Sequence, residues 1–155
     1  MRTLTFKYFE QYRSVIASFN TEPLHASLRE VQPLSVELVS RTELEPLWDL
    51  LVRGFHYLGY QKLLGHRLKY LVLSRGRPVA ALSFSAPALK LRVRDCFIGW
   101  SDDQRKKHLG QLANNSRFLI LPWVRVPHLA SHILGLTIKE LKKDGVTVIL
   151  TTHYL

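Results

Sequence analysis

The sequence predicts an α/β protein of the α+β type, in which helices flank a mixed central sheet. Three observations support this fold class: an apolar hairpin in the middle of the chain, segments of helical spacing between strands, and a C-terminal strand–helix–strand unit. The two strands of that unit run parallel if they share a sheet, whereas the hairpin strands are antiparallel. The predicted sheet is therefore mixed.

The N-terminal part divides into a helical segment and the start of the main domain. Residues 4–20 place apolar side chains at helical spacing, and residues 21–33 contain two prolines, which indicates a linker or a broken short helix. We therefore assign residues 1–33 to an N-terminal helical segment and residues 34–155 to the main domain. Residues 34–40 alternate apolar and polar side chains, which predicts the first strand.

A helix is predicted after this strand, over residues 44–58. Thr42 precedes Glu45 at the spacing of a capping box, and Pro46 falls in the first turn, where proline is tolerated. Apolar residues then continue along one stripe until Gly59, near which we expect the helix to end.

The remaining elements alternate between strands and helices. Residues 66–86 predict a hairpin, and both of its arms are apolar enough for the centre of a sheet. Ser101 is a candidate N-cap for a helix over residues 101–113. The C-terminal unit is then a buried strand over 117–124, a helix over 128–143 and a last strand over 146–152.

Positive charge is concentrated in the second part of the chain. The net charge is +10; residues 1–60 hold six Lys/Arg and seven Asp/Glu, a net of −1, whereas residues 61–155 hold sixteen and five, a net of +11. Such a basic block predicts an acidic partner: nucleic acid first, with DNA favoured, then an anionic membrane surface or a phosphorylated cofactor. The alternative is that these side chains only solvate the surface.

Composition narrows the class of protein. No apolar run approaches the ~20 residues of a membrane span, and the N-terminus has charges where a signal peptide needs its apolar centre. Cys96 is the single cysteine, so an internal disulfide is excluded and no cysteine cluster for zinc is present. We expect a soluble, cytoplasmic protein with no membrane partner.

Four motifs carry a resemblance to a known family: HYLGY (56–60), the segment 65–73 with its LKYLVL, RDCFIGWSDDQR (94–105) and NNSRFLILPWVRVPHLASHILG (114–135). In this order they resemble the domain of the DruA protein of the Druantia anti-phage defence system, over roughly residues 34–155. Related domains also occur near transposase genes. The resemblance implies a place in an antiviral defence system or a mobile element, with other proteins of such a system as partners.

A second resemblance concerns architecture. The order of strands and helices is similar to the first two-thirds of a GNAT-like (N-acyltransferase-like) fold, and the C-terminal part of that fold is missing. In that superfamily a glycine-rich helix start binds the pyrophosphate of acyl-CoA. Here the matching helix start is HLASHILG (128–135), which lacks those glycines.

Four residues are candidates for catalysis: His56, Tyr57, Asp95 and His132. A histidine at a helix end can act as acid or base near neutral pH, or it can interact with the helix dipole. The tyrosine belongs to the core or stacks on a base. The aspartate precedes apolar residues, so it is either a base with a raised pKa or the ion-pair partner of Arg117.

Further residues are candidates for binding phosphate or nucleic acid. The helix start near residue 128 has free N–H groups and a positive dipole end, although a simple capped turn explains it equally well. Paired amides can read a base edge or cap a turn, and a tryptophan can stack on a base or support the sheet. The candidates are Lys69, Arg94, Trp100, Arg105, Lys106, Lys107, Asn114, Asn115, Arg117, Arg125, His128 and Ser131.

A metal site has little support in the sequence. His128 and His132 share a helical face, but HLASH lacks the glutamate of the metalloprotease motif, and a third ligand must come from Asp95 or His153. A metal-dependent nuclease needs clustered carboxylates, and the spacing of the candidates matches no motif: Asp95, Asp102, Asp103 and Asp144. No motif supports acyl-CoA or a divalent metal ion as a cofactor.

The first hypothesis is therefore a nucleic-acid-binding protein of a defence system or mobile element that processes or modifies its substrate. Three alternatives stay open: a non-catalytic DNA-binding module, an acyl-CoA-dependent N-acyltransferase and a metal-dependent nuclease. The sequence does not decide whether the protein is an enzyme.

Overall fold

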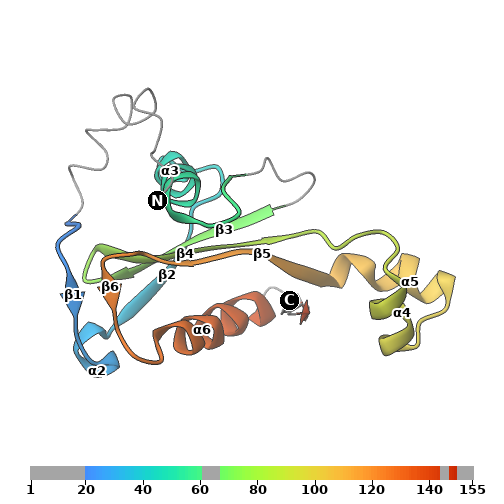
Figure 1. Ribbon diagram of the computed structural model, residues 1–155. Coiled ribbons are helices and arrows are strands. Elements are labelled where there is room, and N and C mark those ends of the chain that lie inside the picture. The colour runs from blue at the N-terminus through green and yellow to red at the C-terminus, as the bar shows by residue number, and fades with distance from the viewer. Residues whose placement is uncertain (1–19, 61–66, 144–146, 150–155) are drawn as a thin grey trace.

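A five-stranded mixed sheet forms the centre of the molecule (Figure 1). The structure is a computed structural model, and it describes residues 20–60, 67–143 and 147–149. The first four strands of the sheet pair antiparallel, and the fifth is parallel to its neighbour. Their order is β2 (Leu34–Leu38), β3 (Arg67–Ser74), β4 (Arg77–Ser85), β5 (Leu112–Ile120) and β7 (Thr147–Ile149). This mixed sheet with its helices confirms the predicted α+β class.

The predicted hairpin is confirmed as β3 and β4, the second and third strands of the sheet. Arg75 and Gly76 connect them, with φ angles of 50° and 80°. Two successive residues with positive φ match the twist of an antiparallel hairpin, and glycine adopts that conformation without steric cost. Seven consecutive residues of β4 are buried, as expected for a strand covered on both faces.

Two helices cover opposite faces of this sheet: α3 (Glu45–Phe55) and α6 (Leu129–Lys143) (Figure 1). Both contribute to one hydrophobic core, which includes Trp48 from α3 and Ile133 from α6. The helix predicted over 44–58 ends at Phe55, because the next residue turns to an extended conformation with φ −82° and ψ 133°. The helix predicted over 128–143 is confirmed and begins at Leu129.

Residues 20–33 pack onto the same domain. The short strand β1 (Leu24–His25) pairs in parallel with β6 (Val124–Arg125), and α2 (Leu28–Val31) buries Val31 in the core. Ser27 caps α2 in a capping box with Glu30. The helix predicted over 4–20 falls on residues 1–19, outside the described residues.

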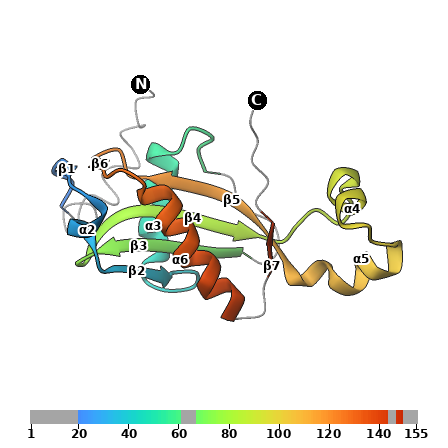
Figure 2. The ribbon, with the colours of Figure 1, turned by 90° about the horizontal axis from the view of Figure 1, so that it is seen from below.

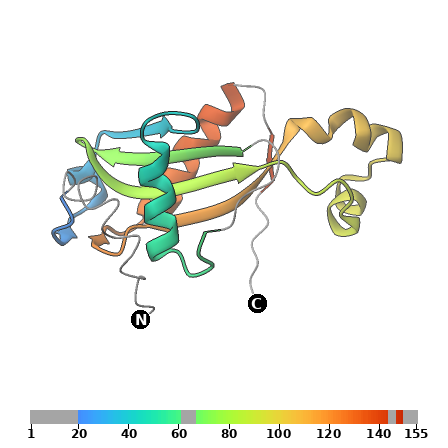
Figure 3. The same cartoon turned by 90° about the horizontal axis from the view of Figure 1, so that it is seen from above.

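Two short helices project beyond the end of the sheet as a helical arm, residues 86–111 (Figures 1, 2 and 3). They are α4 (Arg92–Ile98) and α5 (Asp102–His108), and the 3-10 turn η1 (Leu109–Gln111) leads back to the sheet. Ser101 is confirmed as the N-cap of α5, since its side chain accepts the Gln104 N–H. The sequence did not predict α4.

The helix predicted over 101–113 ends earlier than predicted, and the strand predicted over 117–124 both begins and ends earlier. The chain becomes extended at Leu112, where it pairs with β7 and buries Leu112 and Ala113. The strand ends at Ile120, because residues 121–123 form a turn.

The parallel pairing of β5 with β7 is confirmed and covers Leu112 to Asn114. Beyond Asn114, this edge of β5 has no strand partner among the described residues.

Candidate functional site

A row of polar side chains crosses the middle of the sheet on the face that α3 covers. The strand register places Lys69 on β3 opposite Ser83 on β4, and Ser83 opposite Arg117 on β5. All three are buried, although most of their neighbours in β3 and β4 are apolar. Buried charges persist in a fold only when partners compensate for their lost hydration. The partners of Lys69 and Arg117 therefore define the candidate site.

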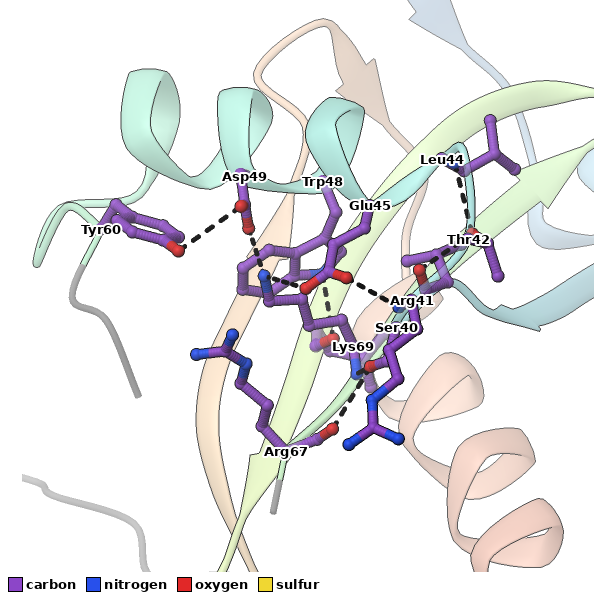
Figure 4. A network of polar contacts seen from close by, with 12 residues as sticks. Ser40, Arg41, Thr42, Leu44, Glu45, Trp48, Asp49, Tyr60, Arg67 and Lys69 are labelled. Carbon is purple, nitrogen blue, oxygen red and sulfur yellow. Dashed lines mark hydrogen bonds and ion pairs between the residues drawn. The ribbon is translucent and has the colours of Figure 1, made fainter. Parts of the chain in front are cut away.

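Lys69 is 1% exposed, and its ammonium lies between two carboxylates of α3 (Figure 4). Its Nζ donates to Glu45 Oε1 at 2.7 Å and to Asp49 Oδ1. The ring centroids of Trp48 and Tyr60 lie 4.9 and 5.7 Å from the same atom, which adds cation–π attraction. Contrary to the prediction, Lys69 therefore does not lie on a phosphate-binding surface. Its ammonium is buried and links α3 to the sheet through Glu45 and Asp49.

Glu45 is held ionised by this arrangement. The hydrogen bond from Lys69 lowers the pKa of Glu45; burial opposes the shift, and the Arg41 N–H, donated at 2.7 Å, supports it. The spacing of Thr42 and Glu45 predicted a capping box, but the glutamate side chain instead faces the lysine. The threonine Oγ1 accepts the Leu44 N–H at 3.2 Å.

Arg117 donates to backbone carbonyls, whereas Lys69 donates to carboxylates. It is 9% exposed, and its Nε donates to the Gly59 carbonyl at 3.1 Å while Nη1 donates to the Ser116 carbonyl at 2.6 Å. Asn115 Nδ2 donates to the carbonyls of Ser83 and Arg117, both at 3.2 Å. No ion pair joins this guanidinium to a carboxylate within the described part of the chain.

His56 follows the last residue of α3 and lies beside Arg117. Its Nδ1 accepts the Leu58 N–H at 3.2 Å, and its ring stacks on Tyr57 with centroids 4.8 Å apart. Burial and then the Arg117 charge lower the pKa of His56, against a hydrogen bond with the Phe118 backbone that raises it. The imidazole is therefore neutral near pH 7, the state in which it can accept a proton.

The end of α3 thus brings together the motifs HYLGY and NNSR. A neutral imidazole, a buried guanidinium and the exposed ring of Tyr57 lie at one place. Such a set can hold an anion, accept a proton and stack on a planar group. Asn114 and Asn115 lie within β5, since the strand begins earlier than predicted.

Asp95 joins the two helices of the arm. Arg94 donates to its Oδ1 at 2.9 and 2.7 Å, and Arg105 Nη1 lies 3.7 Å from its Oδ2 and 2.7 Å from Asp102 Oδ1. Burial opposes ionisation of Asp95, but the hydrogen bonds and the two guanidinium charges outweigh it, so its pKa is lowered. Asp95 therefore pairs with Arg94 and Arg105 and not with Arg117, the predicted partner. The prediction of a raised pKa for Asp95 is wrong, because its pKa is lowered.

The remaining Lys and Arg side chains of the arm are exposed. Lys106 and Lys107 on α5 are exposed, as are Lys90 and Arg92 at the start of α4, whereas Arg94 and Arg105 are buried. Trp100 is half-buried, with its ring centroid 6.1 Å from that of His108. The exposed positive charge of the arm therefore comes from its lysines and Arg92.

The start of α6 carries the third set of predicted residues. His128 lies just before the helix with φ 62°, and its carbonyl accepts the His132 N–H at 3.1 Å. The His132 ring lies 3.4 Å from Gln32 Nε2. Arg125, Ser131 and His128 are exposed.

Apart from Lys69, which lies at the first turns of α3, the predicted site residues fall in three separate places. The end of α3 and the start of α6 lie on opposite faces of the sheet, and the arm lies beyond its end (Figures 1 and 3). His56, Asp95 and His132 do not share one site. The sequence interpretation missed Glu45 and Asp49, although their spacing of four residues around Trp48 was a usable signal.

The described residues contain no group of three or more His, Cys, Asp or Glu side chains arranged to hold a metal ion. Within the same part of the chain, no helix has the length and apolar character that crossing a membrane requires.

The family described as Druantia protein DruA matches residues 4–147 of the chain. No curated protein and no solved structure matches the chain. The GNAT-like architecture stays a prediction.

Proposed function

The chain belongs to the DruA family of anti-phage defence systems, and from this premise we propose that it binds nucleic acid through its helical arm. The arm contains six Lys/Arg and three Asp, a net of +3, within the part of the chain that carries +11. The observation that carries the proposal is the division of these charges between the interior and the surface of the arm.

Inside the arm, the guanidinium groups of Arg94 and Arg105 compensate the charge of Asp95, and Arg105 also pairs with the exposed Asp102. On the surface of the arm, four exposed cations, Lys90, Arg92, Lys106 and Lys107, outnumber the two exposed carboxylates. Of these carboxylates, Asp102 pairs with Arg105 and Asp103 lies 3.9 Å from Lys106. An ion pair between such exposed side chains contributes little. The cations are therefore available to contact phosphates, and the projection of the arm beyond the sheet makes them accessible.

A charge-reversal experiment tests this proposal. The variant Lys106→Glu/Lys107→Glu is compared with Arg29→Glu/Arg75→Glu, which changes the same charge at exposed positions away from the arm. Binding to a labelled DNA duplex and to its single strands is measured by fluorescence anisotropy across a series of salt concentrations.

We expect the arm variant to bind weakly and its slope of log affinity against log salt to flatten by about 2, since each lysine at a phosphate contributes about one unit. The control keeps the wild-type slope. Equal losses for both variants would show that only the net charge matters, and an absence of binding to either DNA at low salt would reject the proposal.

A second candidate is nucleic-acid processing at the end of α3. The lowered pKa of buried His56 beside Arg117 supports it, because perturbed histidines concentrate at functional sites. Labelled DNA is incubated with the wild type, with His56→Gln and with His25→Gln, a control at an exposed histidine. Loss of turnover in His56→Gln but not in His25→Gln supports a catalytic role for His56. Turnover that persists in His56→Gln excludes this role.

A further inference from the structure

We propose that the helical arm binds an unpaired nucleotide, whose base enters the hollow between α4 and α5. This inference rests on the proposed nucleic-acid binding and names the form of nucleic acid that fits the arm. Three features of the arm support it: the hollow, the charge around the hollow, and the apolar surface beside it.

The hollow has a volume of about 470 Å³ and includes Trp100 in its wall. This volume lies within the range of small-ligand sites, about 300–1,000 Å³. Gly99, with φ 76°, ends α4 in a left-handed conformation and directs the chain to Trp100. Aromatic side chains in protein grooves bind unpaired bases by stacking, and every base offers a face for this contact.

The charges around the hollow favour a phosphate beside the base. Lys90, Arg92 and Arg105 line it together with Asp95 and Asp102. Both carboxylates are engaged by guanidinium groups of the arm. Lys90 and Arg92 form no ion pair within the described residues, so they remain to contact the strand that carries the base.

The surface of α4 beside the hollow is apolar and open to solvent. Phe97 is 91% exposed, Val93 79% and Leu89 78%, and the first two are four residues apart on one helical face. A duplex presents phosphates and groove edges, whereas an unpaired strand also presents the faces of its bases.

The size of this apolar surface argues against a protein partner. A stable protein interface buries about 800 Å² on each side, whereas α4 has seven residues and is therefore only about 10 Å long. Two apolar side chains on such a helix, with Leu89 just before it, match the size of a few bases better than the face of a protein.

The test compares a labelled single strand with its blunt duplex, both as DNA and as RNA, by fluorescence anisotropy. The variants are Trp100→Leu and Phe97→Ser, and Leu38→Ser is the control at an exposed apolar residue of β2. Circular dichroism and thermal unfolding check that each variant is folded. Trp100→Phe keeps an aromatic ring at this position and gives a second reading if Trp100→Leu does not fold.

We expect the wild type to bind one of the single strands about tenfold more tightly than its duplex, and each arm variant to lose about tenfold for that strand while duplex binding is unchanged. Trp100→Phe and Leu38→Ser keep the wild-type affinity. If the wild type binds strand and duplex equally well, and the arm variants do not change this binding, the inference is overturned while the proposed function stays intact. Self-association that Phe97→Ser abolishes, without any effect on strand binding, also overturns it.

Discussion

The buried ammonium of Lys69 makes a sharp prediction about stability. It has two carboxylate partners, so loss of one leaves the charge compensated and loss of both does not. We expect Glu45→Gln and Asp49→Asn to lower the free energy of unfolding by about 1–2 kcal/mol each, as for loss of a charged hydrogen bond. The double variant should lower it by about 4–6 kcal/mol, because an unpaired buried charge costs about 3–5 kcal/mol or more.

The magnitude follows from the geometry. Unit charges 2.7 Å apart, the separation of Lys69 Nζ and Glu45 Oε1, attract by about 6 kcal/mol at an effective dielectric constant near 20. Desolvation of the ammonium removes much of this gain. The carboxylate side chains are 21% and 29% exposed against 2% for the lysine side chain. Water therefore reaches the anions more easily than the cation, and a lone cation is the costly species.

The measurement is urea unfolding at pH 7 for both single variants and the double variant. The quantity of interest is the coupling free energy, which we expect to be about 2 kcal/mol in excess of additivity. Lys143→Met removes the exposed pair with Glu140 and should change stability by less than about 0.5 kcal/mol. Additive effects of Glu45→Gln and Asp49→Asn, within about 0.5 kcal/mol, would refute the reasoning.

Three further predictions concern the pH dependence of stability, the helical arm and the binding of acetyl-CoA. The pKa of His56 is lowered in the fold, so on acidification the histidine of the unfolded chain is protonated before that of the folded chain. The contribution of His56 to the free energy of unfolding is therefore fully present above about pH 6.5 and is lost below it. In urea titrations between about pH 7 and pH 5, His56→Gln should make the loss of stability smaller. Asp95→Asn removes the anion between α4 and α5 and should increase proteolytic cleavage within residues 86–111 while global unfolding changes little; protection equal to the wild type would count against this role. For the acyltransferase alternative, a thermal-shift series with acetyl-CoA should show a rise in melting temperature that Ser131→Glu reduces, and a flat response at millimolar ligand would remove that alternative.

Local sequence signals predicted most of the fold. The Arg75–Gly76 turn, the cap at Ser101 and the helical period after His128 each depend on neighbouring residues, and each is found in the structure. The start of β5 was misplaced because Leu112 and Ala113 follow Leu109 at helical spacing, whereas their pairing with β7 decides their conformation. Helix α4 was missed because its exposed apolar residues follow no buried stripe.

The candidate site was predicted less completely, since its contacts join distant segments. His56 and Arg117 were singled out separately, but only the fold shows that the guanidinium lowers the pKa of the histidine. Lys69 was interpreted as a surface residue although it stands within an apolar strand. A lysine in a strand that is buried on both faces must find carboxylates, and Glu45 and Asp49 supply them from one face of α3.

The two ends of α3 are fastened to the sheet by different chemistry. Its first turns are held through Lys69, and its last residue leads into His56, which lies beside Arg117 on β5. Fraying from either end must therefore break buried polar contacts as well as apolar packing. Amide hydrogens in the middle of α3 should exchange with solvent at the rate set by global unfolding, together with those of β3 and β4. The helix and the centre of the sheet would then open as one cooperative unit, while the arm exchanges independently.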